Sequence, residues 1–206
     1  LLKTLEEPPG YAVIIMTSSR KDRILPTIIS RCQLLQFNKL PRDEIRDYLG
    51  QRDDLLTEEH NLEEIILLAD GSIGQALKLL NNDQLWQQRR KFLKFLINFD
   101  DKMNLEINEL INSLDLGRDL ERWDELFKII KTFYRDLMIV KNINNYNNLI
   151  NQSYADEIKR CSQNYSQEEL EKVIKLIEKT NNVIMTNVDC ELAFEVMLQK
   201  IKSRRM

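Results

Sequence analysis

The sequence predicts a mainly α-helical protein that begins with a small α/β part. Three observations support this fold class. A continuous apolar run spans residues 11–16, a second segment rich in apolar residues spans 33–37, and a short helix-forming stretch that starts at Ile24 lies between them. After Leu40 the apolar residues recur every three or four positions, which is the period of an amphipathic helix. Hydrophobic residues make up 43% of the 206 positions and charged residues 31%, a balance typical of a soluble, globular chain.

The α/β part predicts the order helix, strand, helix, strand. Residues 1–7 have a helical composition and are stopped by Pro8-Pro9-Gly10. The run 11–16 is partly β-branched, which is typical of a strand buried on both faces of a parallel sheet. Residues 24–30 fit one short helix, and residues 33–37 fit a second strand. Two strands are too few for a doubly wound sheet, so we expect this chain to be the C-terminal portion of a longer one.

Residues 40–82 predict three short helices. Pro41 stands at the start of the first helix, where its missing N–H group costs nothing. Asn61 and Glu64 have the spacing of a capping box before an apolar run, which marks the start of the second helix. Ser72 opens the third helix in the same way.

From Asp83 to the C-terminus the sequence predicts helices only. Asp119 can cap a long amphipathic helix, residues 166–169 form a full capping box, and Asp189 can cap the last helix. Several helices of this kind predict a bundle. The two tryptophans lie on apolar stripes, so we expect both to anchor a core rather than to stack on bases: Trp86 and Trp123.

Charge and reactive residues exclude several function classes. The net charge of −3 is the wrong sign for a protein that binds nucleic acid over its whole surface, and it leaves open only a local basic patch. The dense basic clusters, residues 89–91 and 202–205, are expected to be solvated helix faces. The single histidine, His60, lies in a polar stretch and is expected to be solvated.

Neither metal binding nor membrane insertion is expected. The three cysteines are scattered and form no CxxC pair, which argues against structural zinc and fits the reduced thiols of a cytoplasmic protein. Acidic residues occur as adjacent pairs, which point to different sides of a helix. No apolar stretch reaches the ~18 residues of a membrane span.

The most informative segment is Leu25-Pro26-Thr27-Ile28-Ile29-Ser30-Arg31-Cys32. An arginine side chain is permanently charged and planar, so two of its donors can meet the charge that develops during phosphoryl transfer. The order of apolar run, short connection and Ser-Arg-Cys resembles the end of the ATPase domain in clamp-loader subunits of the AAA+ superfamily. The resemblance implies that Arg31 is an arginine finger, catalytic in a neighbouring subunit, with Ser30 and Cys32 as its motif neighbours.

Two further stretches carry the same resemblance. The first is Thr17-Ser18-Ser19-Arg20, which resembles most closely the delta-prime type of subunit in bacterial DNA polymerase III. It adds Ser18 and Ser19 to the motif neighbours of Arg31. In Gly71-Ser72-Ile73-Gly74, the glycine Gly74 stands where ATP-hydrolysing clamp-loader subunits have a nucleotide-sensing arginine. This degenerate sensor position favours the delta-prime type over the gamma/tau type. The other interpretation of Gly74 is a helix start that tolerates a glycine.

The resemblance implies three domains. Residues 1–39 would be the C-terminal remnant of an AAA+ ATPase domain, residues 40–82 a helical lid, and residues 83–206 a helical collar through which subunits oligomerise. No GxxxxGK[ST] phosphate loop occurs in the sequence, so we expect ATP and Mg²⁺ to be bound by partner subunits and not here.

The function that this implies is that of a cytoplasmic, non-motor clamp-loader subunit, an assembly protein without a self-contained active site. Its partners would be the motor ATPase and clamp-opening subunits, and, through the complex, the sliding clamp and primed DNA. Two alternatives stay open. One is a truncated gamma/tau-like motor ATPase, and the other is a helical nucleic-acid-binding module.

Overall fold

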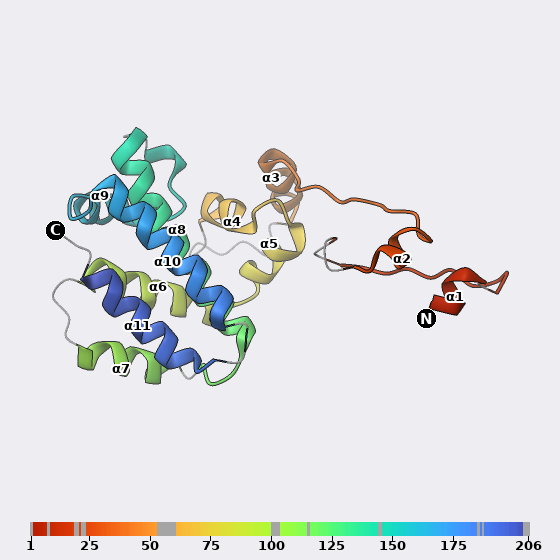
Figure 1. The fold of residues 1–206 in the computed structure, drawn as a ribbon. Coiled ribbons are helices and arrows are strands. Elements are labelled where there is room, and N and C mark those ends of the chain that lie inside the picture. Colours follow the sequence, from red (N-terminus) through yellow and green to blue (C-terminus); the bar gives the residue numbers. More distant parts are fainter. Residues whose placement is uncertain are drawn as a thin grey trace. The chain divides into compact units, whose positions relative to one another are not determined.

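The computed structural model describes residues 2–7, 9–18, 21, 24–52, 61–99, 104–114, 116–143, 146–184, 186 and 188–203. The chain divides into two compact units, Leu1–Lys39 and Leu40–Met206. Helices dominate the described part of the chain, as the sequence predicts (Figure 1). The assignment of an ATPase remnant, a lid and a collar to residues 1–39, 40–82 and 83–206 stays a prediction.

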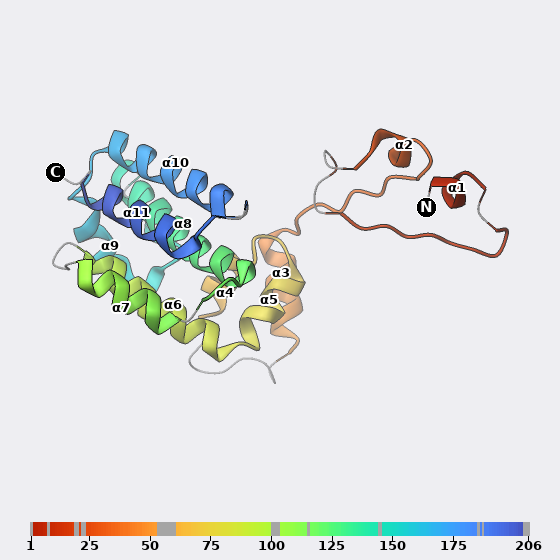
Figure 2. The ribbon, with the colours of Figure 1, turned by 60° about the horizontal axis from the view of Figure 1, so that its bottom comes forward.

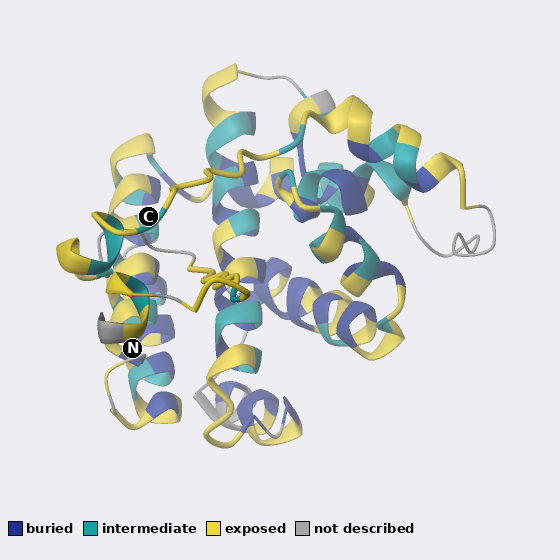
Figure 3. Cartoon of the chain, turned by 90° about the vertical axis from the view of Figure 1, so that its right-hand side faces the viewer, coloured by how far each residue is buried: buried dark blue, intermediate teal, exposed yellow. Residues whose placement is uncertain are grey.

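The first unit has two short helices and two extended segments. Helix α1 spans Leu2–Glu6 and helix α2 spans Pro26–Ile29, and the two are in contact. The prediction of two strands is wrong for the described residues, because neither 11–16 nor 33–37 is assigned as a strand. Both segments are free of helix, but a strand also needs a neighbouring backbone to bond with. Large apolar side chains in both segments are open to solvent: Tyr11, Val13, Ile15 and Phe37. Figure 3 colours exposed parts of the chain yellow.

The second unit begins with three short helices around a core of their own. These helices are α3 (Arg42–Gly50), α4 (Leu62–Ala69) and α5 (Ile73–Leu80). The predicted caps are confirmed, because the Asn61 side chain accepts hydrogen bonds from two backbone N–H groups of α4 and the Ser72 hydroxyl accepts one from α5. The apolar faces of the three helices enclose a cluster that extends to the start of the next helix: Ile45, Leu49, Ile65, Ile66, Ala69, Ala76, Leu79, Leu80, Leu85 and Trp86.

A helical bundle forms the rest of this unit. Its longest described helix, α8, packs against α6, α9 and α10, and α11 lies beside α10 (Figures 1 and 2). The described elements are α6 (Asp83–Ile97), α7 (Asn104–Leu114), α8 (Leu120–Ile143), the 3₁₀ turns η4 (Tyr146–Asn148) and η5 (Gln152–Tyr154), α9 (Ala155–Ser162), α10 (Gln167–Ile184) and α11 (Cys190–Lys202).

Capping and aromatic packing explain these helices. The capping box before α10 is confirmed, since the Glu169 amide donates to Ser166 Oγ over 3.2 Å and the Ser166 amide donates to Glu169 Oε2 over 2.6 Å. Both tryptophans are core anchors, as predicted. Trp86 is 6% exposed and Trp123 is fully buried, and each indole N–H donates to a backbone carbonyl.

No helix among the described residues is long and apolar enough to cross a membrane.

Candidate functional site

Arg31 lies at the C-terminal end of α2, where its guanidinium group has two partners. Proline at the first position of α2 fixes the backbone for a short helical turn, and the chain leaves that turn through Ser30 and Arg31. Nη1 of Arg31 donates to the carbonyl oxygen of Thr27 over 2.9 Å, and Nη2 donates to Oε1 of Glu6 over 2.6 Å. The first bond ties the guanidinium to its own turn, and the second joins it to α1.

The contact with Glu6 is a surface ion pair. The Arg31 side chain is 35% exposed and the Glu6 side chain 47%. Pairs as exposed as this contribute about 0–1 kcal/mol, because water screens the charges and two long side chains lose freedom. A group with a higher negative charge, such as a phosphoryl group, can therefore replace the Glu6 carboxylate at little cost.

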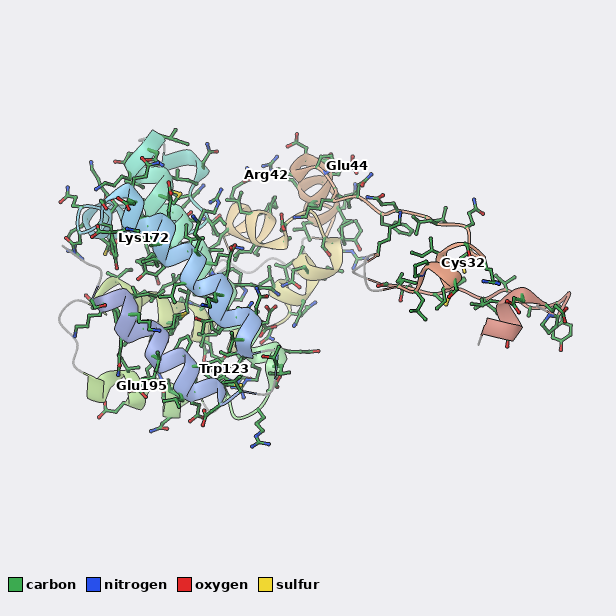
Figure 4. All side chains as sticks on the ribbon, in the orientation of Figure 1. Cys32, Arg42, Glu44, Trp123, Lys172 and Glu195 are labelled. Atoms are coloured by element: carbon green, nitrogen blue, oxygen red, sulfur yellow. The ribbon has the colours of Figure 1, made fainter. Side chains whose placement is uncertain are left out.

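Two of the four motif neighbours of Arg31 lie at the same turn, and the other two come from the segment before α2. Ser30 Oγ donates to Thr27 O over 3.2 Å, so this hydroxyl shares its acceptor with Arg31. Cys32, labelled in Figure 4, is a half-buried free thiol next to Arg31. Ser18 is exposed in the extended segment before α2, and Ser19 lies outside the described residues. The structure therefore brings Ser30, Arg31 and Cys32 together at one turn.

Gly74 lies in the first turn of α5 and is exposed. A Cβ atom built there would approach Ser72 Oγ to 3.9 Å, which is an ordinary contact distance. A Cβ atom would therefore fit, and the backbone does not require glycine at this position. Lys78 is the basic residue of α5, and its ammonium group pairs with Glu125 of α8. The exposed N-terminal turn of α5 thus carries no cation.

The expectation of a solvated basic cluster at 89–91 is wrong for Arg89. Arg90 and Lys91 are exposed, but Arg89 is only 4% exposed and its Nε donates to Glu64 Oε1 over 3.1 Å. Burial lowers the pKa of Arg89 and raises the pKa of the Glu64 carboxyl, while their mutual attraction opposes both shifts. The sequence holds a signal for this burial, because Arg89 is three residues from both Trp86 and Phe92 on the apolar stripe of α6.

Two of the predicted solvated sites lie wholly or partly outside the described residues. His60 lies outside the described residues, as do Arg204 and Arg205 of the C-terminal basic cluster. Among the residues that the structure describes, no group of three or more His, Cys, Asp or Glu side chains could hold a metal ion. The three cysteines are free thiols.

A second surface feature is an apolar stripe along α11 and the residue before its cap. Val188, Leu192 and Val196 are 43%, 58% and 38% exposed. Leu192 and Val196 are four residues apart and lie on one face of α11, and Val188 precedes the helix. The opposite face of α11 is buried in the bundle through Phe194 and Met197. One helix thus carries two apolar faces, and only one of them is used by the core.

The chain is similar to subunits of a bacterial DNA polymerase. Residues 1–41 match the family described as "DNA polymerase III, delta subunit", and residues 83–203 match "DNA polymerase III, delta subunit, C terminal".

Relatives from two bacteria show the same similarity. DNA polymerase III subunit tau of Bacillus subtilis is 27% identical, over 98% of this chain and 39% of tau. Subunit delta' of the same organism is 24% identical, over 97% of this chain and 60% of delta'. DNA polymerase III subunit gamma of Buchnera aphidicola is 38% identical over 40% of this chain and 24% of gamma. This chain therefore covers less than two thirds of the length of each of these relatives.

The match to the second of these families spans more than half of the chain. The chain therefore belongs to the family formed by the C-terminal part of the DNA polymerase III delta subunit, and its resemblance to the subunits of this polymerase is confirmed.

Proposed function

We propose, from this family membership and from the geometry at Arg31, that the chain is part of a non-motor subunit of the DNA polymerase III clamp loader. The subunit helps to load the sliding clamp on primed DNA during replication and donates Arg31 as an arginine finger to a neighbouring ATPase subunit. The observation that carries this proposal is a partly exposed guanidinium held at the end of a helical turn by one backbone bond and one weak ion pair.

In this proposal, Arg31 exchanges the Glu6 carboxylate for a phosphoryl group and thereby stabilises the transition state of phosphoryl transfer. Phosphoryl transfer spreads negative charge over the oxygens of the transferred group, and a planar guanidinium can meet two of those oxygens at once. In the complex, Arg31 leaves the Glu6 carboxylate and donates to the phosphoryl group of ATP bound by the neighbour. A finger supplied in trans accelerates hydrolysis by roughly a thousandfold or more, which corresponds to about 4 kcal/mol of transition-state stabilisation. That gain exceeds the value of the surface pair that it replaces.

Gly74 favours the non-motor role. The relatives carry the names tau, gamma and delta', so similarity alone does not separate a motor from a non-motor subunit. A nucleotide-sensing arginine at the start of α5 would reach a bound phosphate, but Gly74 places no cation there, although a Cβ atom at this position would meet only an ordinary contact. ATP and Mg²⁺ are accordingly assigned to partner subunits.

The apolar stripe on α11 supports assembly with those partners. Exposed apolar side chains in a row are a common mark of a protein interface. The stripe formed by Val188, Leu192 and Val196 lies on the helical bundle, away from Arg31 in the sequence. A contact there can hold the ring of subunits together while nucleotide sites open and close. The ring is proposed to work in the cytoplasm.

The test of the proposal is the ATP turnover of a reconstituted complex that includes the full-length subunit. Arg31→Ala should reduce clamp- and DNA-stimulated turnover while the complex still assembles, and Arg31→Lys should fail as well because an ammonium group lacks the planar fork. Arg46→Ala is the matched control, since Arg46 is also a partly exposed arginine paired with carboxylates. Normal turnover in an intact Arg31→Ala complex would refute the finger.

A further inference from the structure

A chain of buried polar side chains crosses the second unit. Its members come from four different places: Glu64 from α4, Arg89 from α6, Asp136 from α8, and Asn151 from the segment just before η5. Their exposures are 8%, 4%, 0% and 0%. We call these four residues the buried latch.

Direct hydrogen bonds join the members of the latch. Arg89 donates from Nε to Glu64 Oε1 over 3.1 Å and from Nη2 to Asn151 Oδ1. Asn151 donates through both its backbone N–H and its side-chain amide to Asp136 Oδ2, each over 2.8 Å. The other oxygen of Asp136 accepts from the Ile150 amide and from Arg135. Helix α4 is thereby connected through α6 to the centre of the bundle.

The latch lies where apolar packing is interrupted. Helices α3–α5 enclose one hydrophobic cluster and the bundle encloses another, and the two clusters share no residue. A cleft of about 760 Å³ opens between α4 and α5 on one side and α8 and α10 on the other, with Arg89 in its lining. Its walls include Leu68, Leu79, Ile129 and Ile174. Figure 2 shows α4 and α5 beside this end of the bundle.

The two kinds of contact constrain motion differently. Apolar contact is non-directional, so helices that meet across a partly open cleft can shift without losing much of it. A buried ion pair with hydrogen bonds tolerates one geometry only. A small shift would leave a buried charge that is paired neither with its partner nor with water. The charged contact between α4 and α6 therefore selects one orientation of α3–α5 against the bundle.

We propose that the buried latch fixes helices α3–α5 in one orientation relative to the bundle, and that breaking the bond between Glu64 and Arg89 lets them change this orientation. The latch is a conformational device and not the main source of stability. Replacing a buried ion pair by apolar side chains of similar size often leaves stability unchanged or raises it. The proposal does not depend on the role of Arg31.

Pulsed electron–electron double resonance on the full chain measures this orientation. Spin labels are attached at Asp47→Cys on α3 and Lys175→Cys on α10, which are both exposed positions. Cys32 is replaced by serine, and the remaining cysteines are buried, at 5% exposure for Cys161 and 8% for Cys190. The unaltered latch should give a single narrow distance distribution.

The decisive variant is Glu64→Leu with Arg89→Met, which removes both charges together. The thermal transition should persist, and the distance distribution should widen at least about twofold as minor orientations become populated. The control is Lys78→Ala with Glu125→Ala, which deletes a partly exposed ion pair between α5 and α8 and should leave the distribution narrow.

Glu64→Gln is a milder second variant, which keeps the test valid if the double variant does not fold. Glutamine keeps the shape and one carbonyl acceptor of Glu64 but removes the charge, so the fold should survive while the distribution widens less than in the double variant. An unchanged distribution in either folded variant would overturn the proposal, as would equal widening in the control that lacks Lys78 and Glu125.

Discussion

Phe194 should be the most sensitive position of α11, because it joins this helix to two others. Its side chain is fully buried, and its ring centroid lies 5.3 Å from that of Trp123, 5.7 Å from Phe127 and 6.1 Å from Phe92. Trp123 and Phe127 belong to α8 and Phe92 to α6. One substitution at Phe194 therefore removes contacts to both helices at once.

The size of the effect follows from this packing. Phe194→Ala removes a ring and leaves a cavity whose aromatic walls are held by their own helices, so the free energy of unfolding should fall by about 3–5 kcal/mol. Aromatic pairs contribute roughly 0.5–1.5 kcal/mol beyond the buried area, so the loss belongs in the upper part of that range. Phe194→Leu refills most of the volume and should cost about 1–2 kcal/mol.

Urea unfolding followed by circular dichroism measures the loss. Leu192→Ala is the matched control, because it lies two residues away on the same helix but is 58% exposed, and it should change stability by no more than about 0.5 kcal/mol. A loss below about 1 kcal/mol in Phe194→Ala, or equal losses at the two positions, would refute the role given to the aromatic cluster.

Four further outcomes are expected. Leu192→Asp should weaken association with the partner subunits in sedimentation while the urea midpoint stays unchanged; association at full strength would exclude the α11 stripe as the interface. Ser166→Ala should cost about 1 kcal/mol of stability through the lost cap of α10. Backbone bonding from Ser166 lowers the pKa of Glu169, so its contribution to stability is present above the pKa of the unfolded chain and should fade in acid urea titrations as pH falls through the folded pKa. A calorimetric titration of the chain with ATP and Mg²⁺ should show no saturable binding, and a one-site isotherm would contradict the assignment drawn from Gly74.

The helices of the second unit follow from local signals. Asn61, Ser72, Ser166 and Asp189 each accept a backbone hydrogen bond at the start of a helix, as their spacing predicts. Local signals act over three or four residues, so they can be recognised without knowledge of the rest of the fold. The two extended segments of the first unit are different, because a strand depends on a partner that local sequence does not specify.

The positions of charged residues depend on distant contacts more than those of apolar residues do. The sequence singles out Arg31 through its motif, but the contact with Glu6 joins residues that are 25 positions apart. Arg89 stands among basic neighbours, whose composition predicts a solvated face, but it shares the apolar stripe of α6. Its burial depends on Glu64 and Asn151, which are 25 and 62 positions away. Contacts of this range arise from tertiary packing, which periodicity does not encode.

The two apolar faces of α11 show that sequence periodicity cannot tell a core face from an exposed face. Leu192 and Phe194 are both apolar and both belong to stripes of helical period, so a pattern alone cannot say which stripe meets the core. The structure separates them, because Phe194 is fully buried among aromatic rings and Leu192 is 58% exposed. A fold that needed only one apolar face would gain nothing from a second one in water. If the second face is the proposed interface, changes at Phe194 should act on folding and changes at Leu192 on association.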